Sequence, residues 1–262
     1  MTPCWTASGS SGVVSGSRRD LPILPRHVTT PGRDGTMRAR ELAKSLDFTL
    51  VRAGVTADDV AIHCATASRL HVASVVVPPS MVAMTADALR GGDVKVGTVV
   101  SYPFGFDDTS VKAAAVRAAV AAGAREVDVV MDVSALLAGR FGTARADLGA
   151  VVDAARGGTS ARVMVRAVLE APLLGERLLR RACGVVALVG ADFAVTATGV
   201  GGEARTQDVE IMREALPVGV GVIAAGAVHD LASAITLLDA GAQRVSTNAA
   251  PVMVDTLMGV AA

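Results

Sequence analysis

The sequence predicts a single α/β domain folded as a (β/α)8 TIM barrel, with a disordered N-terminal tail in front of it. Hydrophobic residues make up 51% of the 262 residues, which is enough for one large core, and α/β barrels of this length form as one domain. Short apolar runs alternate with helical patterns, as is typical of βαβ units on a parallel sheet. The alternation repeats often enough to close a barrel of eight units.

Residues 1–36 differ in composition from the rest of the chain. They are rich in Ser, Gly, Pro and Thr and have no sustained periodicity. Such a segment cannot bury enough apolar surface to fold, which predicts a disordered tail. A start codon assigned too early is the alternative, because Met37 immediately precedes the first good helix pattern. The barrel domain is expected over residues 37–262.

The expected strands are short runs rich in valine and other apolar residues. In chain order they cover residues 46–50, 72–77, 94–101, 126–133, 162–170, 192–197, 220–225 and 244–248. The helical patterns between and after them cover residues 56–70, 79–90, 108–123, 145–157, 176–190, 206–217, 230–241 and 251–258. Gly123, Gly190 and Gly241 end three of these helices, as C-terminal glycines do. An open doubly wound sheet is the alternative, but it would need a GxGxxG turn after an early strand, and the sequence has none.

Composition excludes several function classes. The formal net charge is zero and aromatic residues are 3% of the chain, so no nucleic-acid partner is expected. No apolar run approaches the roughly 18 residues of a membrane span, so no membrane partner is expected. The three cysteines are not in CxxC pairs, which favours a reducing, cytoplasmic location. No His, Cys or carboxylate spacing indicates zinc, so neither a metal nor another cofactor is expected.

Polar residues lie near the carboxyl ends of the expected strands, where barrels carry their chemistry. Period-two alternation puts Asp128 and Asp132 on one face of the fourth strand, and Arg166 and Glu170 on one face of the fifth. Charges inside apolar strands are costly unless they are paired. A buried polar cluster is therefore predicted, structural or catalytic. For Asp128, a structural carboxylate paired with Arg166 is the alternative to an acid/base role, and the two are compatible.

A family resemblance rests on motifs in the same order and spacing over residues 37–258. The chain reads DFTL at 47–50, VVVPPSMV at 75–82, SYPFG at 101–105, EVDVVMD at 126–132, VRAVLE at 165–170, GADF at 190–193 and LLDAGAQR at 237–244. With these motifs the chain resembles the deoxyribose-phosphate aldolases. The resemblance implies a TIM barrel whose acid/base aspartate corresponds to Asp128. It also implies phosphate-binding loops at Thr198, Gly199, Gly226 and Ser246, although Ala227 replaces the usual second glycine.

The chain departs from this family at the residues of its chemistry. The family's Schiff-base lysine corresponds to Val195, and its second lysine to Ile223. The three lysines present are Lys44 before the first strand, Lys95 at the start of the third strand, expected on its opposite face, and Lys112 in a helix. Arginine cannot replace them, because its guanidinium is not a usable amine nucleophile. Schiff-base chemistry is therefore expected to be absent.

The candidate site residues carry two proposed roles. The catalytic candidates are Asp128, Glu170, Tyr102, Arg166 and Asp47. The substrate-binding candidates are Thr49, Asp132, Val195, Thr196, Thr198, Gly199, Ile223, Gly226, Ser246 and Asn248. Structural alternatives stay open: an architectural role for Asp47, helix or loop capping for Asp132, aromatic packing for Tyr102, and a surface position for His229.

Three functions are compatible with these observations. The first is a repurposed enzyme performing non-covalent acid/base chemistry, of lyase, isomerase or cyclase type, on a small carbonyl or hydroxylated metabolite. The second is an inactive family member that acts as a binding or regulatory partner. The third is a true deoxyribose-phosphate aldolase with an unrecognised nucleophile. A small-molecule substrate is expected, with anionic or phosphorylated compounds included, and a homodimer is an open option.

Overall fold

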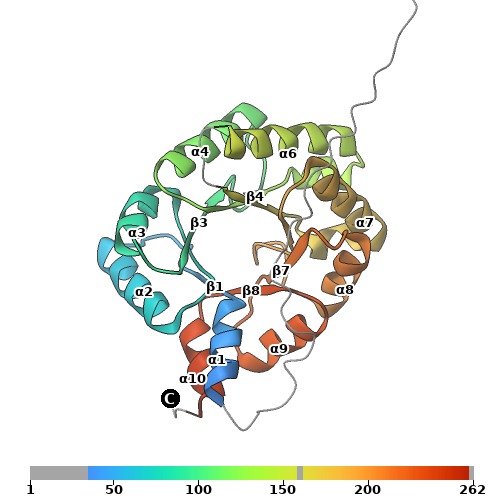
Figure 1. Cartoon of the computed structure of the whole chain (residues 1–262). Helices are drawn as coiled ribbons and strands as arrows, with labels where there is room; N and C mark the ends of the chain where they lie inside the picture. The colour runs from blue at the N-terminus through green and yellow to red at the C-terminus, as the bar shows by residue number, and fades with distance from the viewer. Residues whose placement is uncertain (1–34, 158–161, 260–262) are drawn as a thin grey trace, which may run out of the picture.

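A computed structural model describes residues 35–157 and 162–259. The expectations for residues 1–34 lie outside these ranges. Eight parallel strands close into a barrel in sequence order, and helices surround it (Figure 1). This confirms the predicted (β/α)8 architecture. The strands are β1 Leu46–Thr49, β2 Ser74–Val77, β3 Lys95–Val100, β4 Glu126–Val130, β5 Met164–Val168, β6 Phe193–Val195, β7 Gly221–Ala225 and β8 Arg244–Thr247.

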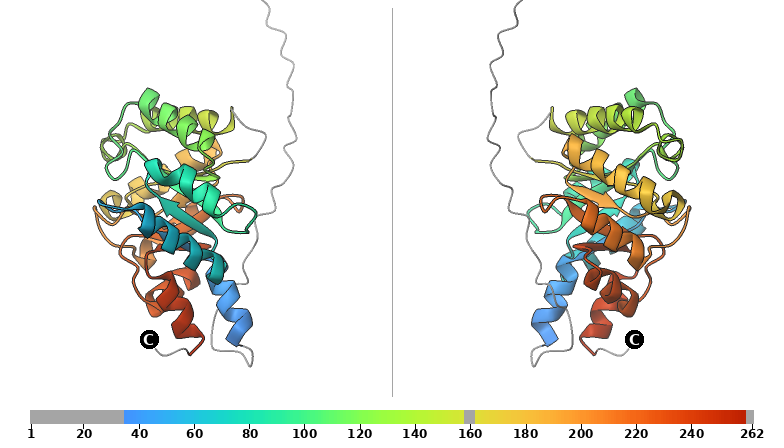
Figure 2. Two further views of the ribbon diagram at one scale, coloured as in Figure 1. Left: turned by 90° about the vertical axis from the view of Figure 1, so that its left-hand side faces the viewer. Right: turned by 90° about the vertical axis from the view of Figure 1, so that its right-hand side faces the viewer.

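The helices follow the predicted order. They are α1 Gly35–Lys44, α2 Ala57–Leu70, α3 Val82–Ala88, α4 Thr109–Ala121, α5 Val133–Leu137, α6 Phe141–Arg156, α7 Ala171–Val189, α8 Thr206–Ala215, α9 Leu231–Asp239 and α10 Ala250–Leu257, with a 3-10 turn at Pro79–Met81 before α3. The side views show α1 and α10 packed together at one edge of the barrel (Figure 2). In the described ranges, no helix is long and apolar enough to cross a bilayer.

Several element boundaries differ by a few residues from the sequence prediction, most clearly at the fourth strand and at helices α6 and α7. The fourth strand ends at Val130 instead of residue 133, because Asp132 caps the short, unpredicted helix α5 by accepting a hydrogen bond from Ala135 N at 2.9 Å. Helix α6 begins at Phe141, four residues before the expected start. Helix α7 begins at Ala171 but contains a non-helical residue, Gly175 at φ 63°, which separates its first turn from the predicted helix 176–190.

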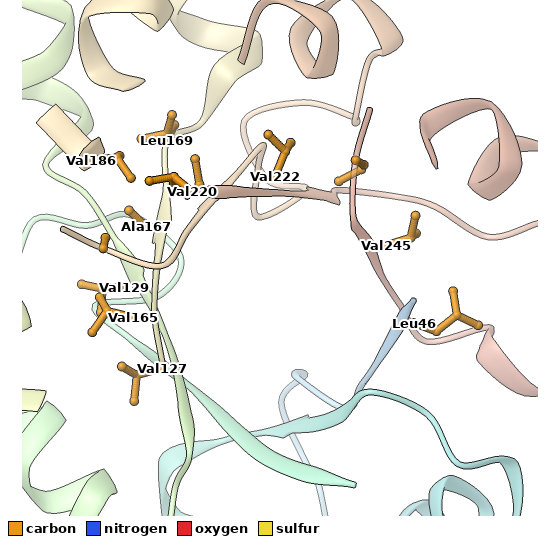
Figure 3. Packing of buried hydrophobic residues seen from close by; sticks show 14 of the residues in the cluster. Leu46, Val127, Val129, Val165, Ala167, Leu169, Val186, Val220, Val222 and Val245 are labelled. Atoms are coloured by element: carbon orange, nitrogen blue, oxygen red, sulfur yellow. The ribbon is translucent and has the colours of Figure 1, made fainter. Parts of the chain in front are cut away.

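The main core lies between the strands and the helices. Leu46, Val222 and Val245 are on the outer side of the ring of strands (Figure 3) and are fully buried there. Residues at alternate strand positions point into the barrel. Inside, Val130, Val168, Val195 and Ile223 pair in register across β4 to β7 and form a second, apolar layer. Two residues of this inner layer, Val168 and Val195, also line the cavity described below.

Candidate active site

A cavity of about 260 Å³ opens at the carboxyl ends of the strands. That is the end of a barrel where chemistry is performed. Its walls come from several strands and from the loops that follow them. It is lined by Thr49, Leu50, Val51, Arg52, Val76, Val99, Tyr102, Asp128, Val168, Val195, Ala197, Thr198, Ala225, Gly226, Ala227, Val228, His229, Ser246, Thr247 and Asn248.

The cavity brings together many of the predicted site residues. Of the catalytic candidates, Tyr102 and Asp128 line it. Of the substrate-binding candidates, it is lined by Thr49, Val195, Thr198, Gly226, Ser246 and Asn248. These eight positions come from eight different strands or loops, and the fold brings them together.

Asp128 lies in a cluster of buried charges inside the barrel. Arg166, on the adjacent strand and in register with it, donates from Nε to Asp128 Oδ1 at 2.5 Å and from Nη2 to Oδ2 at 2.6 Å. The Nη1 atom of Arg166 donates to Glu126 Oε2 at 2.7 Å and to Asp47 Oδ2 at 3.0 Å. The predicted pairing of Asp128 with Arg166 is therefore present, and the guanidinium holds the carboxylate in a fixed orientation.

A second arginine completes the cluster. Arg244 Nη1 donates to both oxygens of Glu126 at 3.0 Å and to Asp47 Oδ1 at 3.1 Å. Ser74 Oγ also donates to Asp47 Oδ1, at 2.7 Å. With all groups ionised, three carboxylates face two guanidinium groups, which leaves one negative charge in excess. In the described part of the chain, no group of three or more His, Cys, Asp or Glu side chains is arranged to hold a metal ion.

The surroundings of Asp128 raise the pKa of its carboxyl. Burial raises the pKa of this carboxyl to about 6, and the charges of Asp47 and Glu126 add to the increase, while Arg166 opposes it. Burial alone would lower the pKa of Arg166, but the neighbouring carboxylates, Asp128 first, raise it, so the guanidinium stays charged. Asp128 is thus a carboxyl that lines the cavity and has a pKa raised to about 6, a value that suits a general acid or base.

Glu170 and Tyr102 hold the loop after β6 from two sides. Glu170 is 3% exposed, and its Oε1 accepts a hydrogen bond from Thr198 N. Tyr102 Oη donates to Thr198 O at 3.1 Å. Burial, and then the charges of Glu170 and Asp128, raise the pKa of Tyr102, so its phenol stays protonated. Glu170 is not among the residues that line the cavity. Its Oε2 has no hydrogen-bond partner among the described residues. Gly201 packs against this oxygen so closely that a Cβ at position 201 would lie 2.4 Å from it.

Several predicted site residues lie outside the cavity lining. Thr196 faces away from the barrel axis: its Oγ1 donates to Ala225 O at 2.7 Å and accepts from Ala225 N at 2.8 Å. Ile223 is fully buried in the inner apolar layer. Gly199 lies against the backbone of the β7 loop, and a Cβ there would be 3.5 Å from Gly226 Cα. Substrate contact by these three residues is not supported.

The predicted catalytic pair Asp47 and Arg166 and the predicted substrate contact Asp132 also stay out of the lining. Asp47 and Arg166 are almost fully buried in the charged cluster, and Asp132 caps α5. The architectural alternatives considered for Asp47 and Asp132 match this arrangement. Glu170 belongs with this group, as a residue that holds a loop.

Several residues of the site were not among the candidates, including the valines of the cavity wall. Glu126 and Arg244 complete the charged cluster, and Arg52 and His229 line the cavity rim. Glu126 shares a strand face with Asp128 by simple alternation, so the signal was present. His229 is exposed, as expected, but it also faces the mouth.

None of the three lysines, all of them within the described residues, lines the cavity. Lys44 pairs with Asp93 at 2.7 Å. Lys112 is buried outside the barrel on α4, where Nζ lies 2.8 Å from Asp147 Oδ2. Lys95 was expected on the opposite face of its strand, and this was wrong. It shares the inward face with Val99 by alternation, but it lies at the amino-terminal end of β3, away from the mouth.

A closed (β/α)8 barrel with a cavity at its carboxyl-terminal mouth defines a TIM barrel whose pocket has the size of a small molecule. Comparison with known proteins makes this more specific. The model of the DeoC/LacD family aldolases matches residues 40–261. The chain belongs to this family.

The relatives have a common name. A deoxyribose-phosphate aldolase of Geobacillus sp. (strain WCH70) is 39% identical over 208 residues, covering 79% of this chain and 92% of the relative. Deoxyribose-phosphate aldolase 1 of Bacillus licheniformis is 36% identical over 211 residues, covering 80% and 93%. The tetrameric deoxyribose phosphate aldolase structure from Aeropyrum pernix superposes with a TM-score of 0.79 at 25% identity, covering 85% of this chain and 93% of that one.

Proposed function

We propose that this aldolase-family barrel binds a small carbonyl or hydroxylated metabolite at its mouth, and that Asp128 transfers a proton on it without a Schiff base. The observation that carries the proposal is the position of Asp128. Its carboxylate faces the cavity while both of its oxygens are held by Arg166. With a pKa of about 6, the carboxyl is mainly ionised at neutral pH and can accept a proton from a bound ligand.

The proton transfer balances without a covalent intermediate. Asp128 takes a proton from carbon next to a carbonyl, or from a hydroxyl group, and later returns it to the ligand. Lyase, isomerase and cyclase reactions all contain such a step. The rim supplies Arg52, His229, Ser246 and Asn248, and backbone N–H groups of the loops, so an anionic or phosphorylated ligand is the preferred partner.

A second candidate is retro-aldol cleavage of a deoxyribose phosphate. The names of the relatives at 36–39% identity favour it over changed chemistry. Against it stands the cavity itself, which contains Val195 and no lysine. An inactive binding partner is the remaining alternative, and a homodimer is compatible with each of the three.

One experiment separates these functions. The protein is incubated in D2O with deoxyribose phosphate and with simple aldehydes and ketones, and NMR follows deuteration next to the carbonyl and release of aldehyde. Borohydride is then added, and intact mass reports any adduct. We expect deuteration or conversion that follows deprotonation of a group with a pKa near 6, is lost in Asp128→Asn, and leaves no adduct. An adduct would support the aldolase, and a complete lack of turnover and binding would support the inactive partner.

A further inference from the structure

The inner wall of the cavity is apolar. Val76, Val99, Val168 and Val195 line it, from β2, β3, β5 and β6, and Ala225 from β7 continues the surface. Val168 pairs in register with Val195, and Val99 pairs with Asp128. Asp128 is therefore a single carboxyl set into a wall of valine side chains.

The polar groups of the cavity come mainly from the β8 and β1 side, at the edges of this wall, where Thr49 pairs in register with Val76 and Ser246 with Ala225. Thr49, Ser246 and Asn248 come from the last positions of β1 and β8 or from the loop after β8, and Thr198 from the loop after β6. The hydroxyl proton of Tyr102 is already used in its bond to Thr198 O. Beside Val99, Val168 and Val195, the described lining residues offer a ligand few hydrogen-bonding partners apart from Asp128.

This arrangement of apolar and polar groups favours a ligand with an apolar carbon chain over one with a hydroxylated chain. Each hydroxyl group placed against the valine wall loses its bonds to water and gains no partner, which weakens binding. Each methylene placed there leaves water for an apolar surface, which strengthens binding by roughly fourfold when it is fully buried. A chain of a few carbons fits a cavity of about 260 Å³.

The geometry points to a ligand with a short, apolar carbon chain between its reacting carbonyl or hydroxyl group and its polar end, in preference to a polyhydroxylated sugar. Val99, Val168 and Val195 are its specificity-determining residues. The inference rests on the proposed function, because it names the ligand class of that same cavity. It also gives Val195 a role of its own, as part of an apolar binding surface.

A matched pair of probes tests this preference. n-Butyl phosphate and erythritol 4-phosphate share a phosphate and a four-carbon chain and differ in three hydroxyl groups, and inorganic phosphate serves as the head-group control. Calorimetry should give binding of n-butyl phosphate at least about tenfold tighter than that of erythritol 4-phosphate. Equal affinities, tighter binding of the polyol, or no gain of either probe over inorganic phosphate would overturn the inference.

Two variants assign the effect to the wall. Val195→Thr replaces one methyl group by a hydroxyl at nearly constant volume, and should reduce the ratio of the two affinities by roughly three- to fivefold. Val218→Thr makes the same change at an exposed position before β7 and should leave the ratio unchanged. Thermal melting checks that both variants fold. Deuteration dependent on Asp128, together with a preference for the polyol, would refute the apolar ligand and leave the proposed function standing.

Discussion

The buried charge cluster makes a quantitative prediction about Asp128→Asn. Burial and the neighbouring carboxylates raise the pKa of Asp128 from 3.8 to about 6, against the opposing effect of Arg166. A shift of about two units corresponds to about 3 kcal/mol between the two protonation states. Since the folded protein holds this proton more tightly than the unfolded chain, Asp128 contributes stability below its unfolded pKa. That stability is lost as pH rises through about 6.

Asparagine keeps the size of the side chain and cannot ionise. The cluster then contains two carboxylates and two guanidinium groups, so the remaining charges balance. We expect the free energy of unfolding of Asp128→Asn, minus that of the wild type, to increase by about 2 to 3 kcal/mol between about pH 4 and about pH 7. Wild-type Asp128 is thus held in the cavity at a cost to stability near neutral pH.

Urea unfolding at a series of pH values measures this difference. Asp132→Asn is the matched control, because asparagine caps a helix as well as aspartate does and the side chain lies outside the charged cluster. A flat difference curve for Asp128→Asn would refute the reasoning. A fall in the difference with rising pH would show that the ion pair with Arg166 outweighs burial.

Three further predictions concern other buried groups. Asp147→Ala should lower the free energy of unfolding by about 3–5 kcal/mol, because it leaves the buried ammonium of Lys112 unpaired; urea unfolding tests this, and a loss below about 1 kcal/mol would contradict it. Thr196→Val should cost about 1–3 kcal/mol through two lost backbone bonds, with ligand affinity by calorimetry unchanged, whereas weakened binding would return Thr196 to the site. Val195→Lys should form an adduct with an aldehyde that borohydride traps and intact mass detects. It should form more adduct than Ile223→Lys, because position 195 lines the cavity and position 223 does not. Equal yields would show that the cavity does not distinguish these two positions.

The sequence predicted the barrel well because its signals are local. Each apolar run and each helical pattern can be recognised within a few residues, and closure follows from their number and order. The errors arose where two local signals compete. Residues 131–133 continue an apolar strand pattern, yet Asp132 caps a helix there, and the capping bond ended the strand.

The site was predicted less completely because its contacts are distant in sequence. Arg244 meets Glu126 across 118 positions of the chain, and only the closed barrel brings them together. By contrast, the error at Thr196 could have been avoided. Adjacent strand residues point to opposite faces, so Val195 and Thr196 could not both contact a ligand in the barrel.

The double hold on Thr198 has a consequence for how ligands reach the cavity. Its N–H is bound by Glu170 and its carbonyl by Tyr102, so the loops after β3, β5 and β6 are tied to one another at a single residue. These two hydrogen bonds fix the position of the loops on that side of the mouth. On the opposite side, Arg52 lies in the loop after β1, and more than half of the Arg52 side chain is exposed. We therefore expect the backbone of Thr198 to keep its position when a ligand enters, so that its side of the mouth is a rigid wall.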